Sequence, residues 1–420
     1  MNILLITPYY PPIISSLSSM MKELAEKFTQ SGHNVIVATI WLPNKLSNRT
    51  KQMAFNAFSI EKHISVVRIK SPFLNSTNYI LRGISQLLLP YLSWNKIKKF
   101  VYKKIDAVLV YTPPLTFSIL GNNIKRKFGA KYLLNIQDIF PQNAIDLGIM
   151  KNKILIKFFE RIEKKAYQSA DKITSHTKTS RKFLIEKKKI PSDKVSLIPN
   201  WIDIEPYINI KSTNSFRKKY GLEGKFIFLF AGVIGPSQGL ELIIKAANEV
   251  KNISHDVCFL IVGDGTEKDR LMKMAEEYSL NNVVFRPLVS IQEYPSLVKD
   301  ADVGIVCLRS MNKTPVIPAK IMGYMAASIP VVAFLNRESD GHDLIKEAKC
   351  GYAIIYGDYK EATKLIIKVF NQKNQLAEFG RNGCNYARTH FSKKACIDKL
   401  EKLIEKTQDM PHHKALHKGI

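Results

Sequence analysis

The chain has 420 residues, 45% of them hydrophobic, so it can bury two cores of ordinary size and we expect two domains. Its net charge is +27, and residues 1–200 carry most of the excess, with 32 Lys and Arg against 11 Asp and Glu. The five cysteines all lie in the second half without CxxC spacing, which argues against a disulfide framework or a zinc site and fits a reducing compartment. The opening MNILLITPYYPP indicates a first strand and not a signal peptide, and no uncharged apolar run reaches the roughly 18 residues of a spanning helix.

The excess of positive charge predicts an anionic partner for the first half of the chain. Nucleic acid, an anionic membrane surface and a phosphorylated acceptor all fit, and composition alone does not choose among them. No RNP, zinc-finger or helix-turn-helix pattern appears in the sequence, so we expect no nucleic-acid partner.

The first forty residues have the pattern that opens a doubly wound sheet. Ile3–Thr7 is predicted as a buried strand, and a proline-rich loop follows it. Leu17–Ser31 is predicted as a helix, Gly32 ends it, and Val35–Thr39 is the next strand. This order is typical of an open α/β domain.

Residues 79–104 combine an apolar stretch with a cluster of lysines. Tyr79–Leu92 is interrupted mainly by Arg82 and Gln86, and after Trp94 come Lys96, Lys98, Lys99, Lys103 and Lys104. This combination is typical of a helix that lies in a membrane interface, and it predicts attachment to an anionic membrane surface. The alternative is a core helix followed by a solvated basic helix.

Two polar residues follow the predicted strand Tyr132–Ile136. Gln137 and Asp138 arrive at its carboxyl end, where open α/β sheets bind ligands, so Asp138 is a candidate catalytic residue. The alternative is an aspartate that caps its own loop. His176, after another strand, is interpreted as structural. Three aspartates between a helix and a strand are interpreted as loop residues, namely Asp106, Asp171 and Asp302.

Residues 226–250 have the most informative pattern of the second half. FIFLF predicts a buried parallel strand, Ala231–Gly239 is a loop with three glycines, and Leu240–Val250 has helical spacing. Glycines let a backbone approach a ligand closely, and the amides at the start of a helix favour a phosphate. The alternative is an ordinary strand-to-helix turn. Gly263-Asp264-Gly265 follows a further strand without the G-x-G-x-x-G pattern, which argues against a dehydrogenase.

Several of these segments resemble one branch of glycosyltransferase family 4. AGVIGPSQGLELIIKAA is similar to the glycine loop of that branch, YTPPLT and NIQDIFPQNAIDL to segments of its first domain, and LIPNWID to its interdomain crossing. The resemblance extends from Ile3 to about Ile404. It implies an α/β fold of the GT-B class, with two doubly wound Rossmann-like domains facing across a cleft, and retaining chemistry. Its branch contains capsule and O-antigen enzymes similar to N-acetyl-L-fucosamine transferases.

The resemblance also implies roles for single residues. In TPVIPAKIMGYMAASIPVVA the two glutamates of the family fall on Pro315 and Gly323, so neither carboxylate is present. Lys320 keeps the pattern of the branch and would neutralise the charge on a departing nucleoside diphosphate, which makes it the second candidate catalytic residue. Asp138 matches the aspartate of the family, whereas Gln137 replaces its usual arginine.

Two sets of binding residues follow from the same comparison. The loops of the first domain that face donor and acceptor contain Ser15, Ser16, Thr112 and Pro113. The residues expected to bind the nucleotide-sugar in the second domain are Gly235, Ser237, Gln238, Gly239, Gly263, Asp264, Arg286, Pro287, Leu288, Arg309, Pro318, Lys320 and Tyr324.

The sequence therefore predicts a cytoplasmic enzyme on the inner face of the cell membrane that needs no metal or other cofactor. It would move a sugar from a UDP-sugar or similar donor to a polyprenyl-diphosphate-linked saccharide, as in capsule or O-antigen assembly. The domains are predicted at 1–200, completed by a last helix at 391–406, and at 201–390, with a disordered tail at 407–420. The alternative is a non-catalytic sugar-nucleotide-binding or scaffold subunit, because both glutamates, the histidine near YTPP and the lysine at position 238 are missing.

Overall fold

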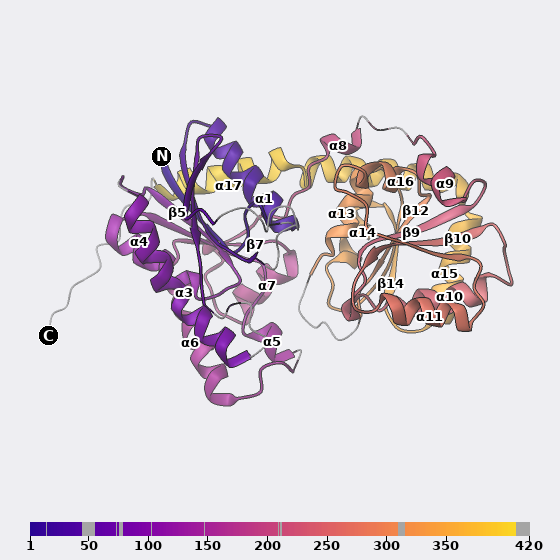
Figure 1. Cartoon of the computed structure of the whole chain (residues 1–420), viewed down its shortest axis with the longest axis horizontal. Helices are drawn as coiled ribbons and strands as arrows, with labels where there is room; N and C mark the ends of the chain where they lie inside the picture. The colour runs from indigo at the N-terminus through magenta and orange to yellow at the C-terminus, as the bar shows by residue number, and fades with distance from the viewer. Residues whose placement is uncertain are drawn as a thin grey trace. The chain divides into compact units, whose positions relative to one another are not determined.

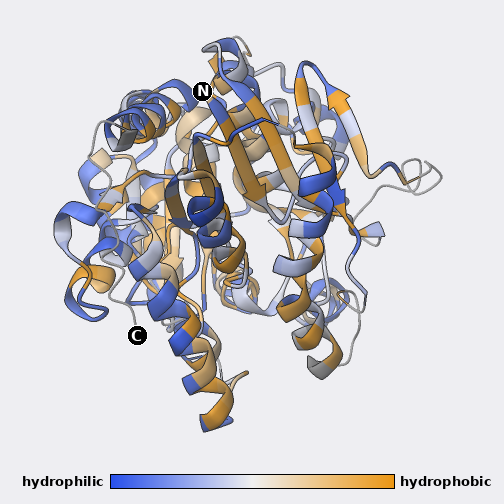
Figure 2. Ribbon diagram, turned by 90° about the vertical axis from the view of Figure 1, so that its left-hand side faces the viewer, coloured by the Kyte–Doolittle hydropathy of each residue, from blue (hydrophilic) through white to orange (hydrophobic). Residues whose placement is uncertain are grey.

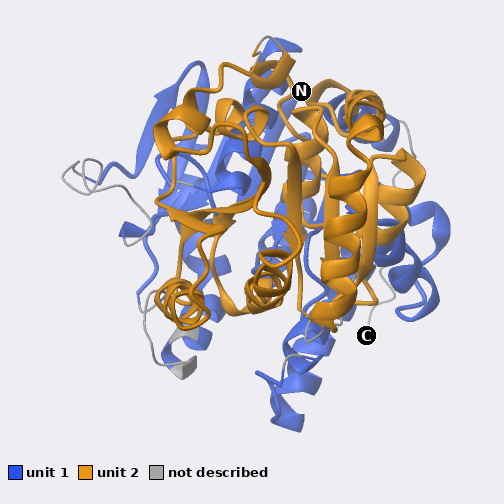
Figure 3. Cartoon of the chain, turned by 90° about the vertical axis from the view of Figure 1, so that its right-hand side faces the viewer, with its two compact units in different colours: residues 1–199, 396–420 blue, residues 200–395 orange. Residues whose placement is uncertain are grey.

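A computed structural model describes residues 1–13, 15–43, 55–72, 74, 79–101, 103–146, 148–208, 210, 212–309 and 316–408. Pro315 and residues 409–420, on which two of the expectations above fall, lie outside this range. The chain divides into two compact units, Met1–Pro199 with Cys396–Ile420 (unit 1) and Asn200–Ala395 (unit 2) (Figure 3).

Unit 1 contains an eight-stranded sheet in the order β3-β4-β2-β1-β5-β6-β7-β8, in which only the β3–β4 pair is antiparallel. Its strands are β1 (Asn2–Thr7), β2 (Asn34–Ile40), β3 (Phe58–Glu61), β4 (Ile64–Ile69), β5 (Ala107–Thr112), β6 (Lys131–Ile136), β7 (Lys172–Ser175) and β8 (Val195–Leu197). Its helices are α1 (Ser16–Gln30), α3 (Tyr79–Phe100), α4 (Phe117–Phe128), α5 (Gln142–Asp146), α6 (Lys153–Ser169), α7 (Lys178–Glu186) and the short η2 (Ser192–Lys194). Figure 2 shows apolar residues concentrated in the strands, as expected when helices cover both faces of a sheet.

Unit 2 contains a six-stranded parallel sheet in the order β11-β10-β9-β12-β13-β14 (Figure 1). Its strands are β9 (Phe226–Val233), β10 (Val257–Asp264), β11 (Val283–Arg286), β12 (Val303–Cys307), β13 (Val331–Leu335) and β14 (Gly351–Ile355). Its helices are α8 (Glu205–Ile208), α9 (Ser215–Tyr220), η3 (Pro236–Gln238), α10 (Glu241–Val250), α11 (Lys268–Glu277), α12 (Tyr294–Lys299), α13 (Ala319–Ala326), α14 (Gly341–Ala348), α15 (Tyr359–Asn371) and α16 (Lys373–His390).

Each face of this second sheet carries its own core. Residues of α10, α11 and α15 pack with the fully buried Phe228, Phe259 and Phe334 on one face. Residues of α12, α13, α14 and α16 pack on the other face. Two parallel sheets with helices on both faces confirm the predicted α/β class, and the strand order reverses direction between β1 and β5 in unit 1 and between β9 and β12 in unit 2. Ligands bind in such sheets beyond the carboxyl ends of the strands at the reversal.

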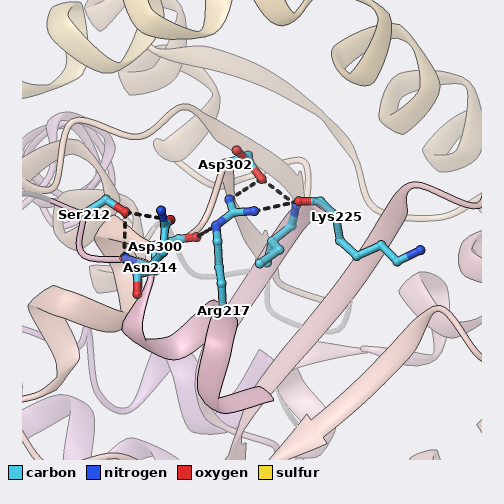
Figure 4. A network of polar contacts seen from close by, with 7 residues as sticks. Ser212, Asn214, Arg217, Lys225, Asp300 and Asp302 are labelled. Carbon is cyan, nitrogen blue, oxygen red and sulfur yellow. Dashed lines mark hydrogen bonds and ion pairs between the residues drawn. The ribbon is translucent and has the colours of Figure 1, made fainter. Parts of the chain in front are cut away.

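The three junction aspartates are structural, as interpreted from the sequence. Each forms a closed pair with the first residues of a neighbouring strand, because its backbone amide donates to a carbonyl there while its carboxylate accepts from the amide of the same residue. The pairs are Asp106 with Asn2, Asp171 with Tyr132, and Asp302 with Ile227. In unit 2 Arg217 adds an ion pair to Asp302 at 2.7 Å and donates to the Asp300 carbonyl (Figure 4). These contacts fix the strand register at the edge opposite the ligand-binding edge.

The last helix, α17 (Lys393–Gln408), begins in unit 2 and packs for most of its length in unit 1. Ile397, Leu400 and Ile404 are buried. Glu401 contacts His33 at 3.1 Å, which ties this helix to the turn between α1 and β2.

Candidate functional site

The centre of the candidate site in unit 2 is the point where β9 and β12 diverge. They pair only at Phe228 and Leu229. Beyond that point β12 no longer pairs with β9, and the Tyr324 hydroxyl provides the hydrogen bonds instead. It accepts from the Ala231 amide and donates to the Leu229 carbonyl, both at 3.2 Å. Gly304 leaves room for the Tyr324 ring, which a Cβ atom at that position would strike. Tyr324 is fully buried, so it supports β9 and offers no surface that a ligand can touch, which corrects the expectation of a ligand contact.

Glycines let the ends of β9 and β10 approach each other. A Cβ atom at Gly263 would collide with the Gly232 carbonyl oxygen, and one at Gly265 with the Ile234 carbonyl. Gly232 itself has φ +140°, which side-chain-bearing residues rarely adopt. The amide of Ile234 then donates to the Asp264 carbonyl at 2.8 Å. The ends of β9 and β10 therefore lie so close together that no side chain fits at Gly263 or Gly265, which explains why glycines occur there.

The loop after β9 continues through η3 into α10. Gly239 has φ +60° and packs under the Tyr356 ring, whose hydroxyl donates to the Gly239 carbonyl at 2.9 Å. On the other side the Arg309 amide, after β12, donates to the Ser237 carbonyl at 2.9 Å. Ser237 is exposed at the turn, and Gln238 is half-buried beside it. The loop is therefore held from β12 and from the segment after β14, with its outer face open to solvent.

Lys320, in the first turn of α13, points into this loop. A Cβ atom at Gly232 would lie 2.8 Å from Lys320 Cε, so the glycine makes room for the lysine. Its Nζ donates to Gln238 Oε1 at 3.2 Å and lies 4.7 Å from the centroid of the Phe230 ring. Burial lowers the pKa of the Lys320 amine from 10.5 to about 8, opposed by Cys307. No carboxylate within the described ranges forms an ion pair with it.

Of the other two cations of the predicted set, Arg309 has a carboxylate partner and Arg286 lies against an aromatic ring. The Arg309 guanidinium lies 2.6 Å from Glu241 Oε1, in the first turn of α10. The Arg286 guanidinium lies over the Tyr220 ring of α9, 5.1 Å from its centroid. Of the two cations without a carboxylate partner in the described residues, Lys320 is the one that points into the glycine loop, and a largely desolvated ammonium in that situation favours a bound anion.

The remaining predicted residues of unit 2 line the same carboxyl edge. Asp264 is exposed at the end of β10 and accepts from the Gly265 amide at 2.9 Å. Pro287 and Leu288 are exposed after β11, and Pro318 precedes the first residue of α13. Gly235 begins η3.

In unit 1 the structure brings Asp138 together with Thr112 and Pro113. These three residues line one shallow depression at the carboxyl ends of β5 and β6, with Phe140 and Tyr167. The pKa of the Asp138 carboxyl is raised by desolvation, opposed by His176, which is buried nearby. The Thr112 hydroxyl donates to the Asn135 carbonyl at 3.1 Å, so it holds the sheet edge.

Ser15 and Ser16 begin α1, on the loop that follows β1. The Ser15 side chain is the N-cap and accepts from the Ser18 amide at 3.1 Å, while Ser16 is exposed in the first turn. Serine at this point therefore has a local structural use, because its oxygen satisfies a free amide of the helix start.

One group in the described ranges has metal-ligand spacing, His33 with Glu401 and Glu405 in unit 1. His33 already contacts Glu401 through one ring nitrogen, and its other nitrogen lies 3.5 Å from the N-terminal amine. This group contains none of the predicted site residues. It holds α17 in place.

Glu241 and Tyr356 are functional neighbours that sequence reasoning missed. Glu241 binds Arg309 and accepts from the Tyr356 hydroxyl at 3.2 Å, so it fixes both sides of the glycine loop. The sequence did contain one indication, because Glu241 lies in the first turn of the helix that follows the predicted anion loop. A carboxylate there would repel a bound anion unless a cation neutralised it. Its pairing with Arg309, 68 positions away along the chain, could not be read from the sequence.

Two family models match the chain. The model for glycosyl transferases group 1 matches residues 212–386, and that for Glycosyltransferase Family 4 matches residues 17–206.

The chain is similar to several curated proteins and solved structures, among them the following two of each. It is 29% identical to a putative colanic acid biosynthesis glycosyl transferase, WcaI, of Escherichia coli, over 53% of this chain and 56% of that protein. It is 25% identical to the probable glycosyltransferase WbjE of Pseudomonas aeruginosa, over 71% of this chain and 74% of that one. The structure of WaaG, a glycosyltransferase involved in lipopolysaccharide biosynthesis, superposes with a TM-score of 0.68 at 15% identity, over 96% and 99% of the two chains. The structure of Anabaena HepE in complex with UDP superposes with a TM-score of 0.68 at 16% identity, over 97% and 100%.

Proposed function

Because the chain belongs to the glycosyltransferases of group 1 and family 4, we propose that it moves a sugar, with retention of configuration, from a UDP-sugar or similar donor to a lipid-linked saccharide. The product would be a surface polysaccharide such as capsule or O-antigen, in the branch similar to N-acetyl-L-fucosamine transferases. The names of two similar proteins support this direction, since they refer to colanic acid and lipopolysaccharide. The solved complexes of HepE with UDP and UDP-glucose support the donor.

The observation that carries the proposal is the uncompensated ammonium of Lys320 beside the glycine loop. Breaking the bond between the sugar and its diphosphate leaves negative charge on the departing oxygen. A fixed cation and fixed backbone amides at that oxygen stabilise the charge without reorganising. Lys320 would supply the cation and the loop from Gly235 to Gly239 the amides. Asp138, which lines the depression at the carboxyl ends of β5 and β6 with Thr112 and Pro113, would contact the acceptor.

The test measures UDP release from candidate UDP-sugars with a phytanyl-diphosphate-linked N-acetylglucosamine acceptor. Lys320→Ala should lower turnover by about 10²–10³, corresponding to about 2.7–4 kcal/mol of barrier, as for the loss of one preorganised donor. Arg309→Ala is the matched control and should cost less, because Glu241 already neutralises that arginine.

Two results would contradict the proposal. A Lys320→Ala protein that turns over within about threefold of the parent, under 1 kcal/mol, removes this residue from the mechanism. A parent that binds UDP but releases none from any donor supports the non-catalytic alternative instead.

Peripheral attachment to an anionic membrane is part of the same proposal. Its support is helix α3, in which large apolar side chains face solvent while two serines are buried. On α3 a stripe of buried positions recurs every fourth residue at Ser85, Leu89, Ser93 and Ile97, with Pro90 buried beside it, and two of the four are serines. The exposed stripe is more apolar, with exposures of 46%, 41%, 42% and 65% at Ile84, Leu87, Leu88 and Tyr91. A helix that turns its larger apolar side chains outward favours a second apolar phase.

A second helix of unit 1 has the same character. Ile154, Leu155 and Phe158 of α6 are exposed, and Lys151, Lys153 and Lys157 stand among them. Figure 1 shows α3, α4 and α6 as neighbours in unit 1, with α4 in contact with both others. No helix in the described ranges is long and apolar enough to span a membrane. The apolar residues would enter the interface and the lysines would bind anionic headgroups, at about 1 kcal/mol each.

Sedimentation with vesicles of phosphatidylcholine, with or without phosphatidylglycerol, tests the membrane proposal. We expect binding to the anionic vesicles that weakens as salt rises, and a marked loss in Leu87→Ser with Tyr91→Ser. Ile253→Ser, at an exposed position of unit 2, is the control and should bind like the parent. Equal binding to neutral vesicles at every salt concentration contradicts the electrostatic part, and no binding to either contradicts the whole.

A further inference from the structure

Unit 1 contains a second hollow at the ligand-binding edge of its sheet, apart from the depression at Asp138. It has a volume of about 310 Å³ and is lined by Pro11, Pro12, Trp41, Asn56, Ser59, Glu61 and Arg68. Pro11 and Pro12 follow β1, Trp41 follows β2, and Arg68 lies next to the last residue of β4. The hollow therefore lies at the carboxyl ends of β1 and β2, the edge at which such sheets bind ligands, and extends along the antiparallel edge strand β3. Its volume is at the small end of the range of about 300–1,000 Å³ for small-molecule sites.

One wall of this hollow is apolar and firmly held. The Trp41 amide donates to the Ile69 carbonyl at 2.8 Å, which joins the residue after β2 to the end of β4. The Trp41 ring packs edge-to-face on Phe55, with 5.5 Å between ring centroids. Trp41 is only partly buried, so its ring and the two prolines offer a flat apolar surface.

The rest of the lining is polar but has no net charge. Arg68 is buried, and its guanidinium donates to Glu61 Oε1 at 2.6 Å, to Ser59 Oγ at 2.7 Å and to the Pro11 carbonyl at 2.9 Å. The Arg68 charge is thus already compensated, in contrast to that of Lys320. Asn56 and Glu61, which are exposed or half-buried, add an amide and a carboxylate that can both accept hydrogen bonds.

These walls exclude two ligand classes. An anion gains little, because Arg68 is neutralised and Glu61 would repel it. An acyl chain would remove the half-buried Glu61 carboxylate and the exposed Asn56 amide from water without offering hydrogen bonds to their remaining donors and acceptors, which is unfavourable. A neutral sugar ring fits both parts of the lining. Its C–H face can pack on the Trp41 ring, and its hydroxyl groups can donate to and accept from the polar side chains.

We propose that this hollow, which we call the Trp41 pocket, binds a neutral sugar residue of the saccharide acceptor. The role as an acceptor subsite rests on the proposed function, whereas the binding of a neutral saccharide does not. The pocket would determine which acceptor is used and would contribute to acceptor KM more than to turnover, because it would contact a residue of the acceptor apart from the reacting hydroxyl.

Saturation-transfer NMR tests the binding directly and without a donor, with cellobiose and chitobiose as neutral probes and glucuronic acid and glucose 6-phosphate as charged ones. The parent should bind the neutral disaccharides in preference to the charged sugars. Trp41→Ala should weaken that binding about tenfold, the loss of about 1.4 kcal/mol of aromatic contact. Asn56→Ala, at the exposed rim, loses only an exposed hydrogen bond from the Phe58 amide, so it should weaken binding less and guards against misfolding of the first variant. Trp94→Ala, on α3, is the matched control and should bind like the parent.

The possible outcomes separate this proposal from the proposed function. Absence of neutral disaccharide binding, equal binding by a folded Trp41→Ala variant, or stronger binding of the charged sugars overturns the Trp41 pocket. If Trp41-dependent binding is found but no donor releases UDP, the transferase proposal fails and the pocket stands. If UDP is released and Trp41→Ala leaves the acceptor KM unchanged, the acceptor role fails while the transferase proposal stands.

Discussion

Replacing Lys320 by methionine should stabilise the protein while it removes the proposed activity. The Lys320 amine has a pKa lowered from 10.5 to about 8 by burial. One pKa unit corresponds to about 1.4 kcal/mol, so carrying this charge in the folded state costs about 3 kcal/mol. Methionine has a similar length and packs well in irregular space. Removing the charge should therefore raise the free energy of unfolding by about 1–3 kcal/mol. For a unit of this size, each kcal/mol corresponds to about 2–4 °C in Tm.

The lowered pKa of Lys320 also predicts how the stability difference between parent and variant changes with pH. Between pH 8 and 10.5 the unfolded chain holds a proton on Lys320 that the folded chain has released, so the stability of the parent rises with pH in this window. Below about pH 8 the penalty is fully present, and above 10.5 it is absent. The advantage of Lys320→Met should thus be greatest at pH 7 and should shrink toward pH 10.5.

The assay is thermal and urea unfolding of parent and variant from pH 7 to 10.5. Lys245→Met is the matched control, because Lys245 is an exposed lysine on α10 of the same unit and should change Tm little. A Lys320→Met protein that melts at or below the parent at pH 7 would refute the reasoning, as would an advantage that stays constant up to pH 10.5.

Three further outcomes follow from the site in unit 2. Gly263→Ala should destabilise unit 2 far more than Gly235→Ala in urea unfolding, because a Cβ at 263 meets the Gly232 backbone and one at 235 meets only a side chain at 3.8 Å; equal effects would contradict the packing argument. Tyr324→Phe should cost about 1–3 kcal/mol in the same assay, since it leaves the Ala231 amide buried without its partner; a neutral effect would show that the strand ends close without it. Calorimetric UDP affinity should persist in EDTA and fall as the pH rises above 8, where Lys320 loses its proton; dependence on Mg²⁺ or Mn²⁺ would contradict the metal-free prediction.

Local sequence patterns determined the elements and the glycine loop. Buried parallel strands appear as uncharged apolar runs, and such runs correctly located β1, β2, β6 and β9. The glycines at 232 and 239 were predicted to serve a turn and a close approach, and their backbone angles of φ +140° and +60° show the reason. The structural role of the junction aspartates could also be predicted from the sequence, because an aspartate between a helix and a strand commonly binds nearby backbone amides.

Only the tertiary structure decided which charges are free and which aromatic side chains are reachable. Arg309 and Lys320 look alike in the sequence, but Glu241 neutralises the first and leaves the second uncompensated. Tyr324 sits in a motif with Lys320, yet its ring fills the space above Gly304 while the lysine points into the loop. The Trp41 pocket assembles residues from β3, β4 and the ends of two other strands. Sequence patterns report periodicity within one element, whereas charge compensation and side-chain access depend on contacts between residues far apart in the chain, which exist only after the sheet has formed.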